Sequence, residues 1–356
     1  VLPDSMYRGV ITQIYKGKGE KSLRQNWRPI TLLPVDYKIL AKVLFNRLKI
    51  HAKMFIDYDQ SCSISDRNIR HGILTIFSVL DKLKFSNENG LLLSVDQKSA
   101  FDVVEWDFLF KTISHFGVGP NFLQWMHIIY NPNKAKSSVS VNSFLSRFFP
   151  ISRGLRQGCP LSPLLYIMVA ETFANKIRSD HNISGITLGG KTVKISLYAD
   201  DMNFFKSDEK SISKIFELFD LYKSASGSML NFEKTQIMKI GDVGLNQFLH
   251  YVAEKIKIYG MVFNEKGLDK NKSFEKAENS VRKLLELKPH SEFSLESRCI
   301  FINTYFMSKF WYYSMFISPT DELIQLANKA IVKFLWYPSR MPKMKGVIIK
   351  NSKNLG

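Results

Sequence analysis

Two adjacent carboxylates, Asp200 and Asp201, lie between two apolar runs of the sequence. Apolar and polar residues alternate before them with the period of a half-buried strand, and apolar residues follow them, so the segment predicts a β-hairpin with an acidic tip. An isolated Asp-Asp pair between strands is more often a solvated turn, because Asp favours turns by hydrogen-bonding to nearby backbone. The pair therefore needs a third carboxylate before metal chemistry is favoured.

Asp96 is a candidate for that third carboxylate. It ends a segment, starting at Leu91, that predicts a strand in which Asp96 points away from the face packed by Leu93 and Val95. If the two predicted strands lie side by side in one sheet, the three carboxylates meet at the same end. Two magnesium ions about 3.5–4 Å apart could then hold the attacking and leaving oxygens of a phosphoryl transfer. This pattern suits a polymerase or a nuclease, whereas Asp96 alone would be interpreted as a strand-end cap.

The composition favours a nucleic-acid partner. The chain has 356 residues, of which 45% are hydrophobic, so it can bury a sizeable core and is not expected to be disordered. Lys and Arg number 50 against 32 Asp and Glu, giving a net charge of +18, and 13% of the residues are aromatic. Positive charge combined with stacking surface is typical of nucleic-acid binding, although some basic proteins bind acidic surfaces non-specifically.

The cysteines and the apolar runs indicate the compartment. Cys62, Cys159 and Cys299 are far apart and form no Cys-x-x-Cys pair, which predicts an intracellular, reducing compartment and no cysteine-based zinc site. Nucleus and cytoplasm cannot be distinguished. The run 299–317 is apolar, but a central Lys309 would cost about 2.5–3.5 kcal/mol in a bilayer, so a buried amphipathic helix is expected and no membrane partner. The chain starts without Met and without a recognisable signal peptide, as expected of a fragment from a longer protein.

Periodicity predicts alternating helices and strands along the whole chain. Apolar positions recurring every three or four residues predict amphipathic helices, and short alternating runs predict strands. The predicted helices are 34–49, 69–84, one through 106–110, one through 122–126, 160–178, 211–223 and several from 272 onward. The predicted strands are 9–16, 91–96, 137–142, 148–151, the two arms of the acidic hairpin, 236–239 and 257–263.

Three segments together resemble the motifs of reverse transcriptases from non-long-terminal-repeat (LINE-type) retrotransposons. They are 96–102, similar to the first palm motif, 153–166, similar to the motif that contacts nucleotide and template, and 198–201, similar to the catalytic box. The resemblance extends from about residue 9 to residue 336. It implies an α+β right-hand polymerase fold with an antiparallel palm sheet covered by helices. A related alternative is a group II intron maturase-like protein, but the region that follows the thumb in maturases is missing from this piece.

The resemblance also implies domains, partners and cofactors. The implied domains are fingers 1–90 with an insertion at 119–152, palm 91–118 and 153–271, a helical thumb 272–340 and a basic tail 341–356. The implied reaction is RNA-directed DNA synthesis, in which a primer 3′-hydroxyl attacks a deoxynucleotide under two Mg2+ ions, with Mn2+ as an alternative. The partners would be an RNA template, a DNA primer, the RNA–DNA hybrid and dNTPs. Endonuclease and zinc-knuckle regions, expected in a complete element, are absent from this piece.

The same resemblance assigns roles near the nucleotide. Asp96, Asp200 and Asp201 would be the catalytic metal ligands. The ring of Phe101 could exclude a 2′-hydroxyl, and ordinary core packing is the alternative for it. Gln157 could place its amide on the nucleotide, while the glycine that follows it lets backbone approach closely.

Three basic residues are further candidates for dNTP binding. Arg28 and Arg67 could bind the triphosphate, since a guanidinium holds phosphate with two hydrogen bonds, although surface solvation is the usual state of an arginine. Lys234 could protonate the departing pyrophosphate or could simply cap a strand. Gly158, next to Gln157, is the glycine that would let backbone approach the nucleotide.

The sequence departs from the family pattern near Arg67. Cys62 and Ser63 stand where Gly-Phe is usual, and Asp66 replaces a glycine, so a distorted turn and an opposing charge are expected there. The segment around Tyr259 also lacks the usual Tyr-Leu-Gly order. A nucleic-acid-binding remnant without polymerase activity therefore stays open as an alternative function.

Overall fold

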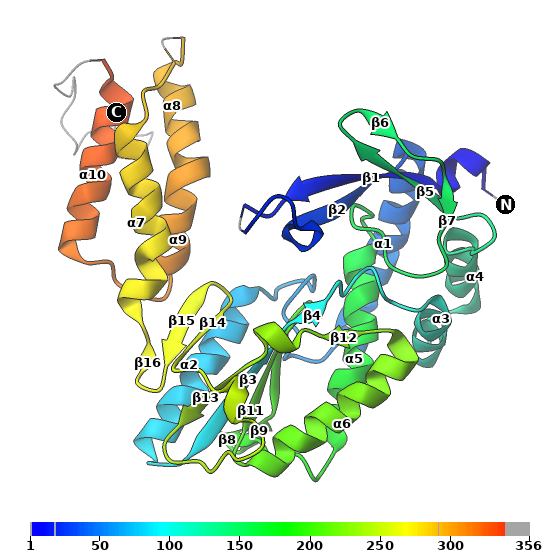
Figure 1. Ribbon diagram of the computed structural model, residues 1–356, viewed down its shortest axis with the longest axis horizontal. Coiled ribbons are helices and arrows are strands. Elements are labelled where there is room, and N and C mark those ends of the chain that lie inside the picture. The colour runs from blue at the N-terminus through cyan, green and yellow to red at the C-terminus, as the bar shows by residue number, and fades with distance from the viewer. Residues whose placement is uncertain (1, 18, 291, 339–356) are drawn as a thin grey trace. The chain divides into compact units, whose positions relative to one another are not determined.

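The structure is a computed structural model that describes residues 2–17, 19–290 and 292–338 (Figure 1). The chain divides between Ile256 and Lys257 into two compact units, each described by itself below. The fold class is α+β, as predicted, with antiparallel sheets and covering helices. The predicted basic tail 341–356 lies outside the described residues, and the predicted borders of fingers, palm and thumb stay predictions.

The central sheet of the first unit carries the acidic hairpin. Its strands lie in the order β10, β11, β3, β13, and every neighbouring pair is antiparallel. The bounds are β3 Gly90–Val95, β10 Ile195–Tyr198, β11 Asp201–Lys206 and β13 Gln236–Ile240. Each strand is short and rich in apolar residues, as expected of strands that helices cover. The predicted strands 91–96 and 236–239 and the predicted acidic hairpin are confirmed.

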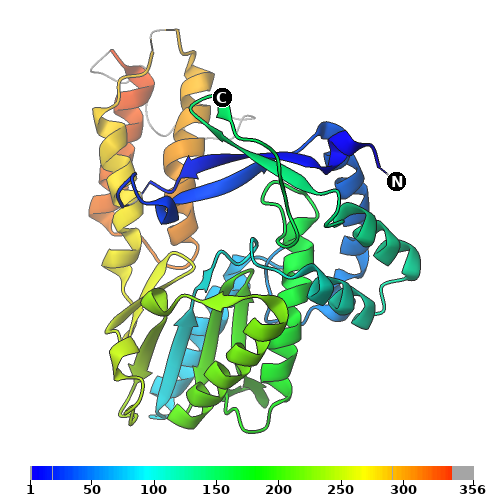
Figure 2. The ribbon, with the colours of Figure 1, turned by 45° about the vertical axis from the view of Figure 1, so that its right-hand side comes forward.

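Helices cover both faces of this sheet (Figures 1 and 2). On one face, Phe173 of α5 (Ser162–Ser179) packs edge to face on the fully buried Phe204, with ring centroids 6.3 Å apart. Helix α6 (Glu209–Ser226) lies beside α5, where Phe219 contacts Phe173 at 5.0 Å. On the other face, Leu83 of α2 (Ile69–Phe85) lies against Gly90. The sheet is therefore a rigid base for whatever its ends carry.

A second sheet forms from the N-terminal strands and the 136–150 segment. β1 (Arg8–Tyr15) pairs antiparallel with β2 (Trp27–Leu32) and parallel with β5 (Lys136–Val141). β5 also pairs with β6 (Phe144–Leu145) and β7 (Phe149–Pro150). The remaining elements of this unit are η1 Asp4–Tyr7, η2 Arg24–Asn26, α1 Val35–Phe55, β4 Gln97–Lys98, α3 Trp106–His115, α4 Pro120–Ile129, β8 Ile186–Leu188, β9 Lys191–Val193, β12 Met229–Leu230, η3 Phe232–Lys234 and η4 Leu249–Tyr251.

The second unit is mainly helical, as predicted for the region after 272. Its helices are α7 Lys270–Glu286, α8 Leu295–Ile302, a π-helical turn Asn303–Met307, α9 Ser308–Ser314 and α10 Asp321–Trp336. The apolar run 299–317 is helical up to Ser314, and Lys309 Nζ donates to Ser280 Oγ on α7 at 2.8 Å. Among the described residues, no helix is both long and apolar enough to cross a membrane.

The single strand predicted over 257–263 is wrong. The structure has two strands there, β14 (Lys255–Ile258) and β15 (Met261–Asn264), and β15 pairs with β16 (Gly267–Leu268). Tyr259 and Gly260 between them have φ values of +51° and +86°, the left-handed conformation of a tight turn. The apolar pattern continues through the turn, so periodicity alone cannot locate it.

Lys206, at the end of β11, makes the stability of the first unit dependent on pH. The side chain is fully buried, its Nζ donates to the Ser184 carbonyl at 3.0 Å, and burial lowers the pKa of Lys206 to about 7. Unfolding restores the ordinary pKa near 10.4, so the unfolded state binds more protons between pH 7 and 10 and stability rises with pH in that window.

We therefore expect the unfolding free energy of the wild type to rise by about 2 kcal/mol from pH 7 to pH 9, relative to Lys206→Met. Urea unfolding of both proteins at the two pH values measures this difference. The measured quantity is the change in unfolding free energy of each protein between the two pH values. The constant cost of losing the hydrogen bond to Ser184 in Lys206→Met therefore cancels. Parallel pH profiles of the two proteins would contradict the prediction.

Candidate active site

The acidic tip is a tight turn between β10 and β11. Tyr198 pairs with Asp201, which leaves Ala199 and Asp200 as the two turn residues, and Ala199 has a φ of +53°. β11 pairs with β3 in a register that places Met202 opposite Val95, so Asp201 lies beside Asp96, the residue after Val95. The structure thus brings Asp96, Asp200 and Asp201 to one end of the central sheet.

Burial and neighbouring negative charge raise the pKa of two of the three carboxylates at the tip. Burial and the charges of Asp200 and Asp96 raise the pKa of Asp201 to about 6. Burial and the charge of Asp96 also raise the pKa of Asp200, while Lys234 and Arg28 oppose this rise. Like charges that raise each other's pKa are stabilised by a cation, and oxygen-only donors suit magnesium. The donor set therefore fits a divalent metal ion.

Asp96 already has a cation beside it. Its Oδ2 accepts from Lys234 Nζ and from Asn231 Nδ2, both at 2.9 Å. Within the part of the chain that the structure describes, no group of three His, Cys, Asp or Glu side chains is arranged to hold a metal ion. Magnesium commonly uses one or two carboxylates and completes its shell with substrate phosphates and water, so an incomplete protein site is compatible with that metal.

Phe101 is linked to the acidic tip through Tyr166. Its half-buried ring stacks on Tyr166 of α5, with centroids 4.5 Å apart and planes at 24°. Tyr166 is fully buried, and its pKa is raised first by burial and then by the charges of Tyr222 and Asp200, which places it near the tip. Tyr166 therefore holds one face of the Phe101 ring in a fixed position.

The loop with Gln157 and Gly158 is fixed to both neighbouring elements. Gln157 Nε2 donates to Asp102 Oδ1 at 3.1 Å, and the Gln157 carbonyl accepts from the Thr31 amide of β2 at 2.7 Å. Gly158 has a φ of +121°, and a Cβ there would lie 2.5 Å from the Thr31 carbonyl oxygen. Only glycine allows this approach. The same strand carries Arg28, which is exposed and whose charge partly offsets the rise in the pKa of Asp200.

Arg67 is used differently from the other candidates. Its guanidinium donates to the backbone carbonyls of Ile56 at 3.0 Å, Gln60 at 3.0 Å and Asp57, and it lies over the Tyr58 ring at 4.7 Å. These contacts hold the 56–60 turn together. The structure therefore brings Arg28 and Lys234 to the carboxylates and engages Arg67 in the chain that supports them.

Gln60 supports the acidic tip directly, a role that the sequence analysis did not assign. Residues 59–61 run beside β10, with Leu197 N donating to the Asp59 carbonyl at 2.8 Å and Ser61 N donating to the Leu197 carbonyl at 3.0 Å. The fully buried Gln60 accepts at Oε1 from the Ala199 amide at 3.1 Å. The only sequence signal for this contact was the Asp59-Gln60 pair.

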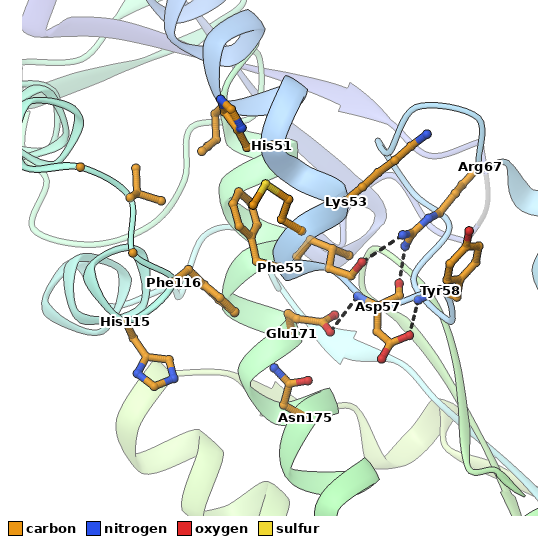
Figure 3. A pocket seen from close by; sticks show the side chains of 16 residues that line it. His51, Lys53, Phe55, Asp57, Tyr58, Arg67, His115, Phe116, Glu171 and Asn175 are labelled. Atoms are coloured by element: carbon orange, nitrogen blue, oxygen red, sulfur yellow. Dashed lines mark hydrogen bonds between the residues drawn. The ribbon is translucent and has the colours of Figure 1, made fainter. Parts of the chain in front are cut away.

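An ion-pair network anchors the 57–61 segment to α5, and Figure 3 shows the part of it in which Glu171 meets Asp57. Arg178 binds Asp59 through two hydrogen bonds of 2.7 and 2.5 Å and Glu171 at 2.7 Å, and Glu171 Oε1 accepts from the Asp57 amide at 3.1 Å. Burial raises the pKa of Glu171 to about 7. Glu171 also lines a cavity of about 960 Å³ beside the end of α1, and none of the acidic-tip residues Asp96, Asp200 and Asp201 lines that cavity.

The family departure at Asp66 keeps the backbone shape that glycine would give. Asp66, which replaces the family's glycine, has a φ of +64°, in the left-handed region that glycine favours. Ser63, which stands where Phe is usual, has a φ of +57°. The Asp66 carboxylate is 84% exposed and forms an ion pair with Lys53 at 2.6 Å. The positive charge of Lys53 therefore offsets the negative charge of Asp66. The turn expected to be distorted is thus formed, at the cost of two strained residues.

Ser63→Gly is expected to stabilise the protein by roughly 0.5–1 kcal/mol. The left-handed conformation costs an ordinary residue about 1–2 kcal/mol, of which the greater unfolded-state entropy of glycine offsets about 0.5–1 kcal/mol. Ser65→Gly is the matched control in the same turn, where φ is not positive, and should destabilise by roughly 0.5–1 kcal/mol. Chemical denaturation measures both, and equal effects of the two changes would refute the strain at Ser63.

Comparison with protein families gives a match over most of this architecture. The family model described as "Reverse transcriptase (RNA-dependent DNA polymerase)" matches residues 15–269. A Xenopus laevis protein, "Transposon TX1 uncharacterized 149 kDa protein", is 30% identical over 348 residues, covering 94% of this chain and 26% of that protein. A type-1 R2 retrotransposable-element polyprotein of Popillia japonica is 21% identical over 233 residues, covering 65% of this chain and 32% of its own length. The chain thus spans about a quarter to a third of these curated relatives.

Solved structures share the fold. Apo telomerase from Candida tropicalis, truncated from its C-terminal domain, superposes with a TM-score of 0.53 at 16% identity, covering 76% of this chain and 55% of that one. Candida albicans telomerase, solved with a fragment of telomeric RNA, gives a TM-score of 0.52 at 12% identity, covering 95% and 64%. At these identities the likeness concerns the fold, which is the right-hand polymerase architecture predicted from the motifs.

Proposed function

Because this chain belongs to the reverse transcriptase (RNA-dependent DNA polymerase) family, we propose that it extends a primer 3′-hydroxyl with deoxynucleotides on an RNA template. The observation that carries the proposal is the end of the central sheet, where Asp96, Asp200 and Asp201 meet. Their negative charges and the positive charges of Lys234 and Arg28 together influence the pKa of Asp200. We propose an RNA template, a DNA primer and their hybrid as partners, and an intracellular setting.

Asp96, Asp200 and Asp201 would hold two magnesium ions, with manganese as an alternative. The bound ions would stabilise the attacking and leaving oxygens of an in-line phosphoryl transfer. Lys234 Nζ lies 2.9 Å from Asp96 Oδ2. Metal bound by Asp96 would neutralise this carboxylate and release Lys234 from it. Its ammonium would then be free to give a proton to the departing pyrophosphate.

Residues from three elements would bind the nucleotide. Arg28 of β2 would pair with the triphosphate, because its guanidinium is exposed beside the acidic tip. Gln157 and Gly158 would present an amide and a bare backbone to the base and sugar. Arg67, proposed from the family pattern as a triphosphate ligand, would need to release three backbone carbonyls first, so we propose a supporting role for it.

The direct test is primer extension with purified protein, magnesium and the four dNTPs on an RNA template annealed to a DNA primer. We expect extension that requires the template and stops on addition of a chelator. A protein that binds the hybrid with steep salt dependence but adds no nucleotide would be the remnant without polymerase activity, and the proposal would fail. Restored extension after readding magnesium or manganese shows that metal loss, not unfolding, stopped the reaction.

Phe101→Ala is expected to relax sugar selectivity. The Phe101 ring is held against Tyr166 and would meet a 2′-hydroxyl, so its removal should raise ribonucleotide incorporation relative to deoxynucleotide incorporation by roughly tenfold or more. Single-nucleotide addition assays with matched dNTP and rNTP measure the ratio. Phe108→Ala removes another half-buried ring, on α3, and should leave the ratio unchanged. If the two variants behave alike, the ring serves only packing.

A further inference from the structure

The segment from 141 to 150, at the outer edge of the N-terminal sheet, exposes an unusual amount of apolar surface (Figure 1). All ten of its residues are exposed, and we name it the hairpin surface. Its apolar members are Val141, Phe144, Leu145, Phe148, Phe149 and Pro150. Phe144 is 80% exposed and Phe148 47% exposed. A contiguous exposed apolar patch on a protein of this kind marks a binding surface.

The backbone fixes how these rings are presented. Asn142 and Ser143 have φ values of +48° and +69°, which closes a two-residue turn between β5 and β6. The pair Val141 and Phe144 flanks this turn, so Phe144 stands at the hairpin tip. The tip is thus a short, fixed support for an aromatic ring and not a flexible loop.

The stretch of chain that forms the hairpin surface carries only positive charge. No Asp or Glu occurs in the sequence between Asp107 and Glu171. Arg147 is exposed within the surface, Arg8 of β1 lies over the Phe148 ring at 5.4 Å, and Lys136 is exposed at the start of β5. Aromatic rings interleaved with cations bind single-stranded nucleic acid, because bases stack on the rings while the cations hold the phosphates.

We propose that the hairpin surface is an accessory binding site for single-stranded RNA, separate from the acidic tip. The chemistry selects an unpaired strand, since the bases of a duplex are already stacked and cannot reach the rings. The absence of acidic residues from the stretch of sequence between Asp107 and Glu171 favours a polyanion over a protein partner. The inference rests on the proposed function only in choosing RNA over DNA.

The test is fluorescence anisotropy of the whole protein with a labelled oligouridine of about ten nucleotides, in the presence of saturating unlabelled RNA–DNA primer–template. We expect Phe144→Ala and Phe148→Ala each to weaken oligouridine binding by at least about fivefold. Arg147→Gln should lower the slope of log affinity against log salt by about 0.7. Phe85→Ala, which removes a ring that is 96% exposed on α2, is the control and should change binding by less than about twofold.

The outcomes separate this proposal from the proposed function. Binding needs no synthesis, so a protein that binds oligouridine through the hairpin surface but adds no nucleotide would uphold this inference and refute only the catalytic one. Wild-type protein that does not bind oligouridine, or hairpin variants that bind it as the wild type does, would overturn the inference. So would full competition by a blunt RNA duplex of equal length.

Discussion

Replacing Asp200 with Asn is expected to lower primer extension by about a thousandfold or more while leaving the fold intact. The change keeps the size of the side chain but removes a charge from the end of the sheet where three carboxylates meet. A metal ion that polarises a phosphoryl oxygen contributes several kcal/mol to the transition state, and each 1.36 kcal/mol is about tenfold in rate. Primer extension with magnesium on an RNA template measures the loss.

Thermal unfolding distinguishes lost chemistry from lost structure in this variant. Burial and a like charge raise the pKa of Asp200, so the neutral amide that Asp200→Asn introduces should leave stability unchanged or slightly increased. Asp220→Asn, at an exposed position of α6, is the matched control and should extend primers normally. Extension by Asp200→Asn at the rate of Asp220→Asn would remove Asp200 from the catalytic assignment.

Replacing Arg178 with Met is expected to destabilise the first unit by about 3–5 kcal/mol. The change leaves the carboxylates of Asp59 and Glu171, with side chains 21% and 1% exposed, without their cation. The 57–61 segment would lose its anchor on α5, and Gln60 would no longer hold the Ala199 amide, so extension should fall as well. Chemical denaturation gives the first effect and primer extension the second.

Two comparisons make the Arg178 prediction specific. Lys214→Met breaks an exposed pair with Glu217 on α6 and should leave the unfolding free energy almost unchanged. Adding Glu171→Gln to Arg178→Met removes one of the stranded charges and should restore part of the stability. A double variant as unstable as Arg178→Met would show that the loss comes from packing of the long side chain and not from the unpaired carboxylates.

The sequence predicted the parts of the fold whose patterns are local. The strand before Asp96 and the hairpin before Asp200 follow from alternation, and both strands form one sheet as expected. Helix ends were less accurate: α1 runs to Phe55, beyond the predicted end at 49, because the periodic apolar pattern weakens before the helix stops. Local periodicity therefore located the elements but not their limits.

The parts that the sequence could not give depend on contacts between distant residues. Gln60 meets Ala199 across 139 positions, and Arg178 meets Asp59 across 119. No spacing rule predicts such pairs. The family pattern placed Arg67 with the nucleotide, whereas the structure occupies its donors with the backbone of its own turn. The roles of Asp96, Asp200 and Asp201 and of the nucleotide ligands remain predictions for the experiments above.

The close backbone approach at Gly158 indicates one way in which a related chain could lose activity. The backbone of the loop after Arg156 lies directly against the backbone of strand β2, so any side chain at position 158 would clash with the Thr31 carbonyl and displace either the loop or the strand that carries Arg28. A sequence could keep all three aspartates and still be inactive. Intact acidic residues are therefore a poor criterion for catalytic activity. The presence of Gly158, which lets two backbone segments touch, is a better one.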